Sequence, residues 1–173
     1  MQIKIIIIGI LVGCSYLIGE YIYKGYTKRH KQVHELIRIL EIIRMDLSFG
    51  LYTLEEIFKR IGDKSEFSAS VFFKKVESEL KNDRSKLLDE ILNENMYMLS
   101  KETYLQNREV DELKKLILTL GKSDIESQER MIDLSIENLK KLTDETQEDI
   151  NKKGIVYRKL STIIGLIVGI ILI

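Results

Sequence analysis

The stretch IKIIIIGILVGCSYLIG, residues 3–19, decides the fold of this 173-residue chain. It is apolar apart from Lys4, whose long side chain can reach the polar interface while its stem stays among apolar groups. Aromatic residues are enriched where a helix leaves a bilayer, and four tyrosines gather toward the C-terminal end of this run: Tyr16, Tyr21, Tyr23 and Tyr26. We expect residues 1–23 to form a transmembrane helix.

A second apolar run, LSTIIGLIVGIILI, occupies residues 160–173. As a helix its length is about 21 Å, which is short for a hydrocarbon core of about 30 Å. Residues 155–157 supply the missing length if Arg158 and Lys159 extend toward the interface. We expect residues 158–173 to form a second transmembrane helix and residues 24–157 to form the domain between the two.

Basic residues flank this central segment on both sides. They are Lys24, Lys28, Arg29 and Lys31 after the first run, and Lys152, Lys153, Arg158 and Lys159 before the second. Lys and Arg next to a membrane helix favour the cytosolic side. We therefore expect a cytosolic central domain in contact with membrane lipid at both ends.

The formal net charge of zero hides a segregation of charge along the chain. Residues 41–151 hold 17 Lys and Arg against 25 Asp and Glu, whereas the rest of the chain has an excess of positive charge. An acidic body makes nucleic-acid binding unfavourable, because phosphate contacts need a basic face. The absence of proline leaves long helices uninterrupted, and an all-α fold is predicted.

The periodicity of apolar residues predicts a bundle of about six helices, of which the first and last are continuous with the transmembrane helices. One helix is expected to end at Gly50, a second to begin at the capping box Thr53–Glu56 and to end with a left-handed glycine at Gly62, and a third to cover residues 65–80. A short helix over 86–92 and a longer one over 96–120 follow, the latter closed by Gly121. The motif Ser123–Glu126 is typical of a further capping box that opens the last helix.

Two pairs of glycines spaced by four residues occur in the apolar runs, Gly9 with Gly13 and Gly165 with Gly169. Small residues at this spacing let another membrane helix approach closely. We expect these four glycines to take part in helix packing within the membrane.

The residues 11–14, Leu-Val-Gly-Cys, also resemble the lipobox at which bacterial lipoproteins are cleaved and acylated on cysteine. The alternative interpretation is therefore an exported helical envelope protein anchored through Cys14. Two features oppose it: the apolar run continues beyond Cys14, and the flanking lysines lie downstream, whereas a signal peptide carries its positive charge upstream.

No motif of a catalytic, cofactor-binding or metal-binding site is present in the sequence. His30 and His34 have the spacing of two ligands on one helical face, but they lack a third ligand and the glutamate of zinc proteases. We expect a protein that is not an enzyme, with no cofactor, no metal and no small-molecule substrate.

The pieces together resemble the stage III sporulation protein AB family of endospore-forming bacteria over nearly the whole chain. The resemblance rests on the glycine-spaced first run followed by tyrosines and Arg29, on residues 36–50 followed by Thr53-Leu54-Glu55-Glu56, on Leu120-Gly121-Lys122-Ser123-Asp124 with Gln128, and on Tyr157-Arg158-Lys159-Leu160 entering Gly165-Leu166. Three positions depart from the family's pattern: Thr53, where proline is common, Lys122 within a glycine-rich approach, and Ser161, where glycine is common.

This resemblance implies a component of the membrane complex between mother cell and forespore, with a bundle similar to the cytoplasmic domain of platform proteins in type II secretion and type IV pilus machines. It implies a place in the mother-cell membrane that faces the forespore, other membrane components of a secretion-like channel as partners, and a cytoplasmic secretion-type ATPase docked on the bundle. The resemblance does not say which residues make these contacts. Five residues are candidates: Glu41 and Asp46 as charges facing the ATPase, for which a solvated helix face is the alternative, and Ser123, Asp124 and Gln128 as shapers of a turn that a partner reads, for which helix capping alone is the alternative.

Overall fold

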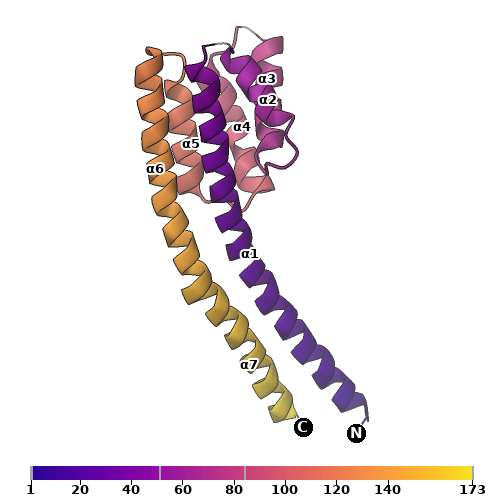
Figure 1. Cartoon of the computed structure of the whole chain (residues 1–173). Coiled ribbons are helices and arrows are strands. Elements are labelled where there is room, and N and C mark those ends of the chain that lie inside the picture. The colour runs from indigo at the N-terminus through magenta and orange to yellow at the C-terminus, as the bar shows by residue number, and fades with distance from the viewer. Residues whose placement is uncertain (1, 51, 84, 173) are drawn as a thin grey trace. The chain divides into compact units, whose positions relative to one another are not determined.

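The computed structural model describes residues 2–50, 52–83 and 85–172, and for residues 2–5 and 172 it describes the backbone alone. All regular structure within these ranges is helical (Figure 1). The elements are α1 (Gln2–Ser48), α2 (Leu54–Gly62), α3 (Ser70–Asn82), α4 (Leu88–Glu102), α5 (Asn107–Thr119), α6 (Ile125–Asp149), the π-helical turn η1 (Ile150–Gly154) and α7 (Ile155–Leu172). The predicted all-α class is confirmed.

The chain divides into two compact units. Residues 31–143 form a helical bundle, and the segments 1–30 and 144–173 form a second unit. Helices α1 and α6 contribute residues to both units, and η1 joins α6 to α7 without a break in the helical path. The first and last helices of the bundle are thus continuous with the terminal apolar helices, as predicted. The membrane boundaries at residues 23 and 158 stay a prediction.

The core of the bundle is built from one apolar stripe on each helix. On α1 the apolar residues Val33, Leu36, Leu40 and Ile43, at spacings of three and four, are all buried. Helix α2 packs on α3, where the ring centroids of Phe58 and Phe73 lie 5.4 Å apart. The remaining core is drawn mainly from α4, α5 and α6: Ile91, Leu92, Leu99, Leu113, Leu116, Ile117, Ile132 and Leu139.

Local signals set most of the helix ends. Gly50 and Gly121 adopt φ angles of 61° and 77°, the left-handed region that glycine enters without steric cost. The predicted capping box at α2 is present: the Thr53 hydroxyl accepts from the Glu56 backbone N–H, and the Glu56 carboxylate accepts from the Thr53 backbone N–H. These ends follow from the residues at the ends themselves.

Gly62 has a different function from the predicted left-handed cap, and that prediction was wrong. It is buried at the end of α2, and a Cβ atom there would lie 2.9 Å from Lys74 Cα on α3. The absence of a side chain therefore lets two helix backbones approach closely. Helix α2 does end at Gly62 as predicted, but the C-cap residue that follows, Asp63, stays in the right-handed helical region.

Two other predicted helices differ from the structure in their bounds. Helix α3 begins at Ser70 rather than at residue 65. The predicted helix over 96–120 is divided, because α4 continues to Glu102 and α5 begins only at Asn107. In the break between them, the Tyr104 backbone N–H donates to the buried side chain of Gln32 on α1 at 2.6 Å. A long-range partner therefore satisfies one backbone group at this break, while Thr103 and Glu109 satisfy two others locally, accepting from the backbone N–H groups of Leu105 and Gln106.

Candidate functional site

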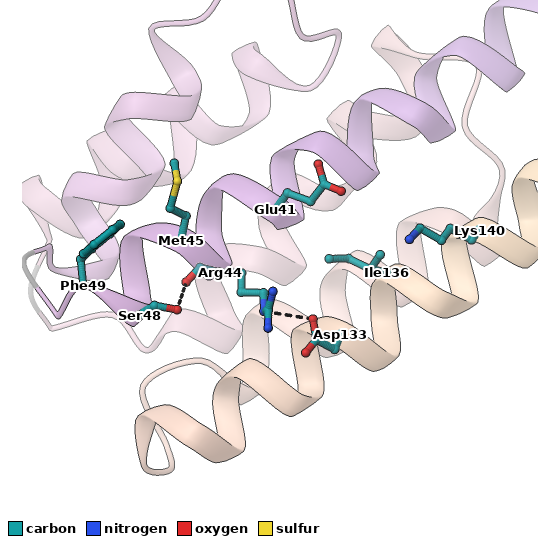
Figure 2. Close-up of a pocket in the computed structure, with 8 residues that line it drawn as sticks. All are labelled: Glu41, Arg44, Met45, Ser48, Phe49, Asp133, Ile136 and Lys140. Carbon is teal, nitrogen blue, oxygen red and sulfur yellow. Dashed lines mark hydrogen bonds and ion pairs between the residues drawn. The ribbon is translucent and has the colours of Figure 1, made fainter.

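The bundle carries a groove of about 500 Å³ between α1 and α6. Its lining combines apolar and charged side chains: Glu41, Arg44, Met45, Ser48 and Phe49 from α1 and its C-terminal end, and Asp133, Ile136 and Lys140 from α6. Figure 2 shows Arg44 reaching from α1 to Asp133 of α6, an ion pair with an Nε–Oδ1 distance of 3.0 Å.

Two of the apolar side chains in this groove are unusually exposed. Met45 is 51% exposed and Phe49 67% exposed, and both belong to the last turn of α1 or follow it directly. The Ser48 hydroxyl, which lies between them in sequence, is within hydrogen-bond reach of two acceptors, the Arg44 carbonyl and the Glu129 carboxylate. Aromatic residues and methionine are enriched at protein–protein interfaces relative to the rest of the protein surface.

The two predicted α1 charges lie in different environments. Glu41 is exposed and lines the groove. Asp46 is 2% exposed, and its carboxylate accepts from the Arg60 guanidinium of α2 at 2.7 Å. The Arg60 guanidinium in turn lies 4.6 Å from the centroid of the Tyr52 ring. Asp46 therefore ties α1 to α2, whereas Glu41 is free to contribute a surface charge.

Ser123, Asp124 and Gln128 meet at the turn between α5 and α6. The Gln128 side chain accepts from the Gly121 backbone N–H at 2.9 Å and donates to the Ser123 carbonyl at 2.6 Å, so one amide closes the turn from both sides. The cap of α6 is Asp124 rather than the predicted Ser123, because the Asp124 carboxylate accepts from the Ser127 backbone N–H and hydroxyl. These hydrogen bonds lower the pKa of the Asp124 carboxyl.

In the second unit, α7 packs against α1 through small residues. Ser15 and Ser161 each donate a hydroxyl hydrogen bond to the backbone carbonyl of the other. A Cβ atom at Gly165 would lie 2.6 Å from Ser15 Cβ, and one at Gly169 would lie 3.0 Å from Ile8 Cγ2. A Cβ atom at Gly19 would meet the Arg158 carbonyl oxygen at 3.0 Å. The close contact of the two helices depends on these glycines.

Gly9 and Gly13 differ from Gly165 and Gly169 in this respect. A Cβ atom at either position would meet no other described atom within 4 Å. The two predicted glycine pairs therefore do not pack on each other. Gly165 instead meets Ser15 and Val12, whereas Gly19 meets Arg158 and Ser161. Ser15 and Gly19 have a small-residue spacing of four that was visible in the sequence once serine is counted as small.

Polar contacts also join the two segments of this unit at residues that are nearer to the bundle along the chain. The Arg29 guanidinium lies 3.4 Å from the Asp149 carboxylate, and His30 Nδ1 lies 2.9 Å from the buried Thr146 hydroxyl. The turn η1 follows directly, and π-helical turns accommodate one extra residue in a helix. The buried positions Thr146, Ile150 and Gly154 are spaced by four residues. In a regular α-helix of 3.6 residues per turn, residues at this spacing would rotate gradually away from one face.

Further buried polar groups on α1 were not predicted. The Glu35 carboxylate accepts from the Ser68 backbone N–H at 2.8 Å, in the connection between α2 and α3. With Gln32 and Asp46, it attaches three separate segments of the bundle to one helix. The only sequence signal is a polar residue that falls within an apolar stripe.

Helix α3 is joined to α4 by a polar contact at Glu79. Its side chain is 19% exposed, and this partial burial raises the pKa of the carboxyl. Hydrogen bonds from Lys75 and Asn95 outweigh the burial and lower the pKa below its usual value.

Among the residues that the structure describes, no group of His, Cys, Asp and Glu side chains is placed to hold a metal ion.

Two helices are long and apolar enough to cross a membrane, one within Ile6–Ser48 and one within Ile125–Ile171, which suggests association with a membrane. No curated protein and no solved structure matches the chain. The family model described as stage III sporulation protein AB matches residues 4–173, essentially the whole chain. The chain therefore belongs to the stage III sporulation protein AB family.

Proposed function

We propose that this protein is a non-enzymatic platform in the mother-cell membrane, part of a secretion-like channel complex that faces the forespore, and that its cytosolic bundle docks a secretion-type ATPase. Membership of a sporulation family supports the biological setting. The two apolar helices, each flanked by basic residues on the bundle side of the sequence, support the membrane setting and the orientation.

One observation carries the docking part of the proposal. The groove with exposed Met45 and Phe49 is built from α1 and α6, and these are the helices that continue into the apolar segments. A protein bound there contacts the elements that run toward the membrane without any intervening loop. Glu41 and Lys140 offer one charge of each sign to a partner, which favours a specific orientation over general adhesion.

Binding of the full-length chain in lipid nanodiscs to the cytoplasmic ATPase of the same sporulation system tests this proposal. Phe49→Asp removes the most exposed aromatic anchor of the groove and is expected to weaken binding about 30-fold, the effect of losing one hot-spot residue. Glu41→Lys is expected to weaken it less, mainly through slower association. Because both side chains are exposed, neither change should alter the unfolding temperature.

A matched control is Asp111→Lys, a charge reversal of the same size at an exposed position on α5 that does not line the groove. It should leave ATPase binding within about twofold of the unchanged chain, as surface changes outside an interface do. The proposal is refuted if the unchanged chain does not bind the ATPase, or if Asp111→Lys weakens binding as much as Phe49→Asp.

The lipoprotein alternative makes a separate prediction. If Cys14 is acylated, radioactive fatty acid added to cells labels the protein, and Cys14→Ala abolishes the label. The proposed platform carries no such label. Cleavage before Cys14 would also remove Ile8 and Val12, which contact the Gly169 position of α7.

A further inference from the structure

The unit formed by the two chain ends carries a second groove, of about 290 Å³. Tyr16 of α1 lines one side, and Arg158, Lys159, Thr162 and Ile163 of α7 line the other. The lining therefore contains two cations and no carboxylate. The Thr162 hydroxyl is occupied by a hydrogen bond to the Arg158 carbonyl of its own helix, so this residue presents its methyl group and stem.

The two cations of this groove are held differently. The Arg158 guanidinium of α7 lies 4.6 Å from the centroid of the Tyr23 ring and 3.7 Å from the Glu20 carboxylate. These two α1 side chains hold the guanidinium against α1. The Glu20 carboxylate also lies 3.9 Å from the Lys24 ammonium, so its charge is shared by two cations. With Lys159, the region has three cations against the single carboxylate of Glu20, so its local charge is positive.

The hydrogen-bond donors of Lys159 and Tyr16 are available to a ligand. Within the described part of the chain, neither the Lys159 ammonium nor the Tyr16 hydroxyl has a hydrogen-bond or ion-pair partner. Both side chains are exposed, and they belong to the edge of the apolar segments, where a membrane helix meets the lipid headgroups. An acceptor from the bilayer itself would satisfy them.

We propose that this groove binds an anionic phospholipid, with the headgroup phosphate between Lys159 and Arg158 and an acyl chain along the Tyr16 ring and Ile163. Basic pockets between membrane helices on the cytosolic side are suited to such headgroups. The ring of Tyr16 supplies an apolar wall and its hydroxyl a donor to the phosphate or the ester oxygens. This inference rests on the membrane position of the two helices, and it is independent of ATPase docking.

Native mass spectrometry of the purified full-length chain in detergent micelles tests the proposal. Phosphatidylglycerol and phosphatidylcholine with identical acyl chains are added separately, and the retained lipid is counted. The chain should bind phosphatidylglycerol more tightly. Lys159→Gln should weaken that binding about fivefold, the loss expected for one cation at an anionic lipid surface. Tyr16→Phe, which removes only a hydroxyl, should weaken it less.

Lys24→Gln is the matched control, because it removes one cation from the same region without changing the lining of the groove. Equal losses for Lys24→Gln and Lys159→Gln would indicate diffuse charge attraction and overturn the proposal. Equal binding of the two lipids would overturn it as well. Displacement of phosphatidylglycerol by glycerol 3-phosphate at similar concentrations would identify a soluble phosphate as the ligand and exclude the lipid.

Discussion

Adding one methyl group at Gly165 should separate the two terminal helices. The Cβ atom of Gly165→Ala would lie 2.6 Å from Ser15 Cβ, whereas ordinary van der Waals contact begins at 3.4 Å, so the helices must move apart by about 0.8 Å. This displacement stretches and weakens the reciprocal hydrogen bonds of Ser15 and Ser161. Overpacking costs about 1–3 kcal/mol, and complete loss of one interhelical hydrogen bond would add about 0.6 kcal/mol. The contact between the two helices should lose about 1–4 kcal/mol.

Gly13→Ala is the control for this experiment. It makes the same chemical change on α1, but its Cβ atom would meet no described atom within 4 Å. Both variants gain the same helix propensity, about 1 kcal/mol in water. The difference in stability between the two therefore isolates the steric effect of the helix contact.

The measurement is a titration with sodium dodecyl sulfate in mixed micelles. Dyes on cysteines that replace the exposed Lys24 and Lys152, in a Cys14→Ala background, report separation of the two helices by energy transfer. The midpoint should fall markedly for Gly165→Ala and stay near that of the parent for Gly13→Ala. Equal midpoints for the two variants, or a larger loss for Gly13→Ala, would refute the assigned packing.

Three further predictions concern the bundle and use chemical denaturation of the full chain. Glu35→Leu leaves the Ser68 backbone N–H without its acceptor and should lower the free energy of unfolding by about 1–3 kcal/mol, whereas Glu35→Gln, which keeps an oxygen, should cost less. Arg60→Ala leaves the Asp46 carboxylate buried without its counter-charge and should cost about 3 kcal/mol; a loss below about 0.5 kcal/mol would show that the pair does not stabilise the bundle. The lowered pKa of Glu79 means that its contribution to the free energy of unfolding is fully present above the carboxyl's usual pKa of 4.5 and is lost as pH falls through the folded-state pKa. The stability difference between the unchanged chain and Glu79→Gln should therefore vanish in acid, and a constant difference at every pH would contradict this.

Local chemistry explains why several helix ends were predictable. A left-handed residue at Gly50 or Gly121, or the reciprocal bonds of Thr53 and Glu56, depends on atoms within one turn of the chain. The break between α4 and α5 was missed because it contains neither glycine nor proline, and because Glu109 caps α5 without a Ser or Thr three residues before it. Gln32, from a distant part of the sequence, adds a contact to the Tyr104 backbone. The function of Gly62 was misassigned for a similar reason, since the backbone of α3 excludes a side chain there.

Much of the candidate site was also beyond sequence reasoning. Helical periodicity places Glu41 and Asp46 on α1, but it does not reveal that Arg60 of α2 binds one of them and leaves the other exposed. The groove with Phe49 exists only where α1 and α6 are brought together. Burial and ion pairing depend on two helices that pack together. The residue pattern of one helix alone therefore does not predict them.

The sequence by itself determined the all-α class, the two apolar terminal helices, the acidic body between basic flanks and the family to which the chain belongs. These follow from hydrophobicity, charge and local turn chemistry, which act over a few residues. Only the tertiary structure decided that Gly165 and Gly169 pack on α1 while Gly9 and Gly13 stay open, and which polar residues of α1 are buried. The physical reason is that close approach of two backbones depends on the facing surface of both, and a one-dimensional pattern specifies each surface without its partner.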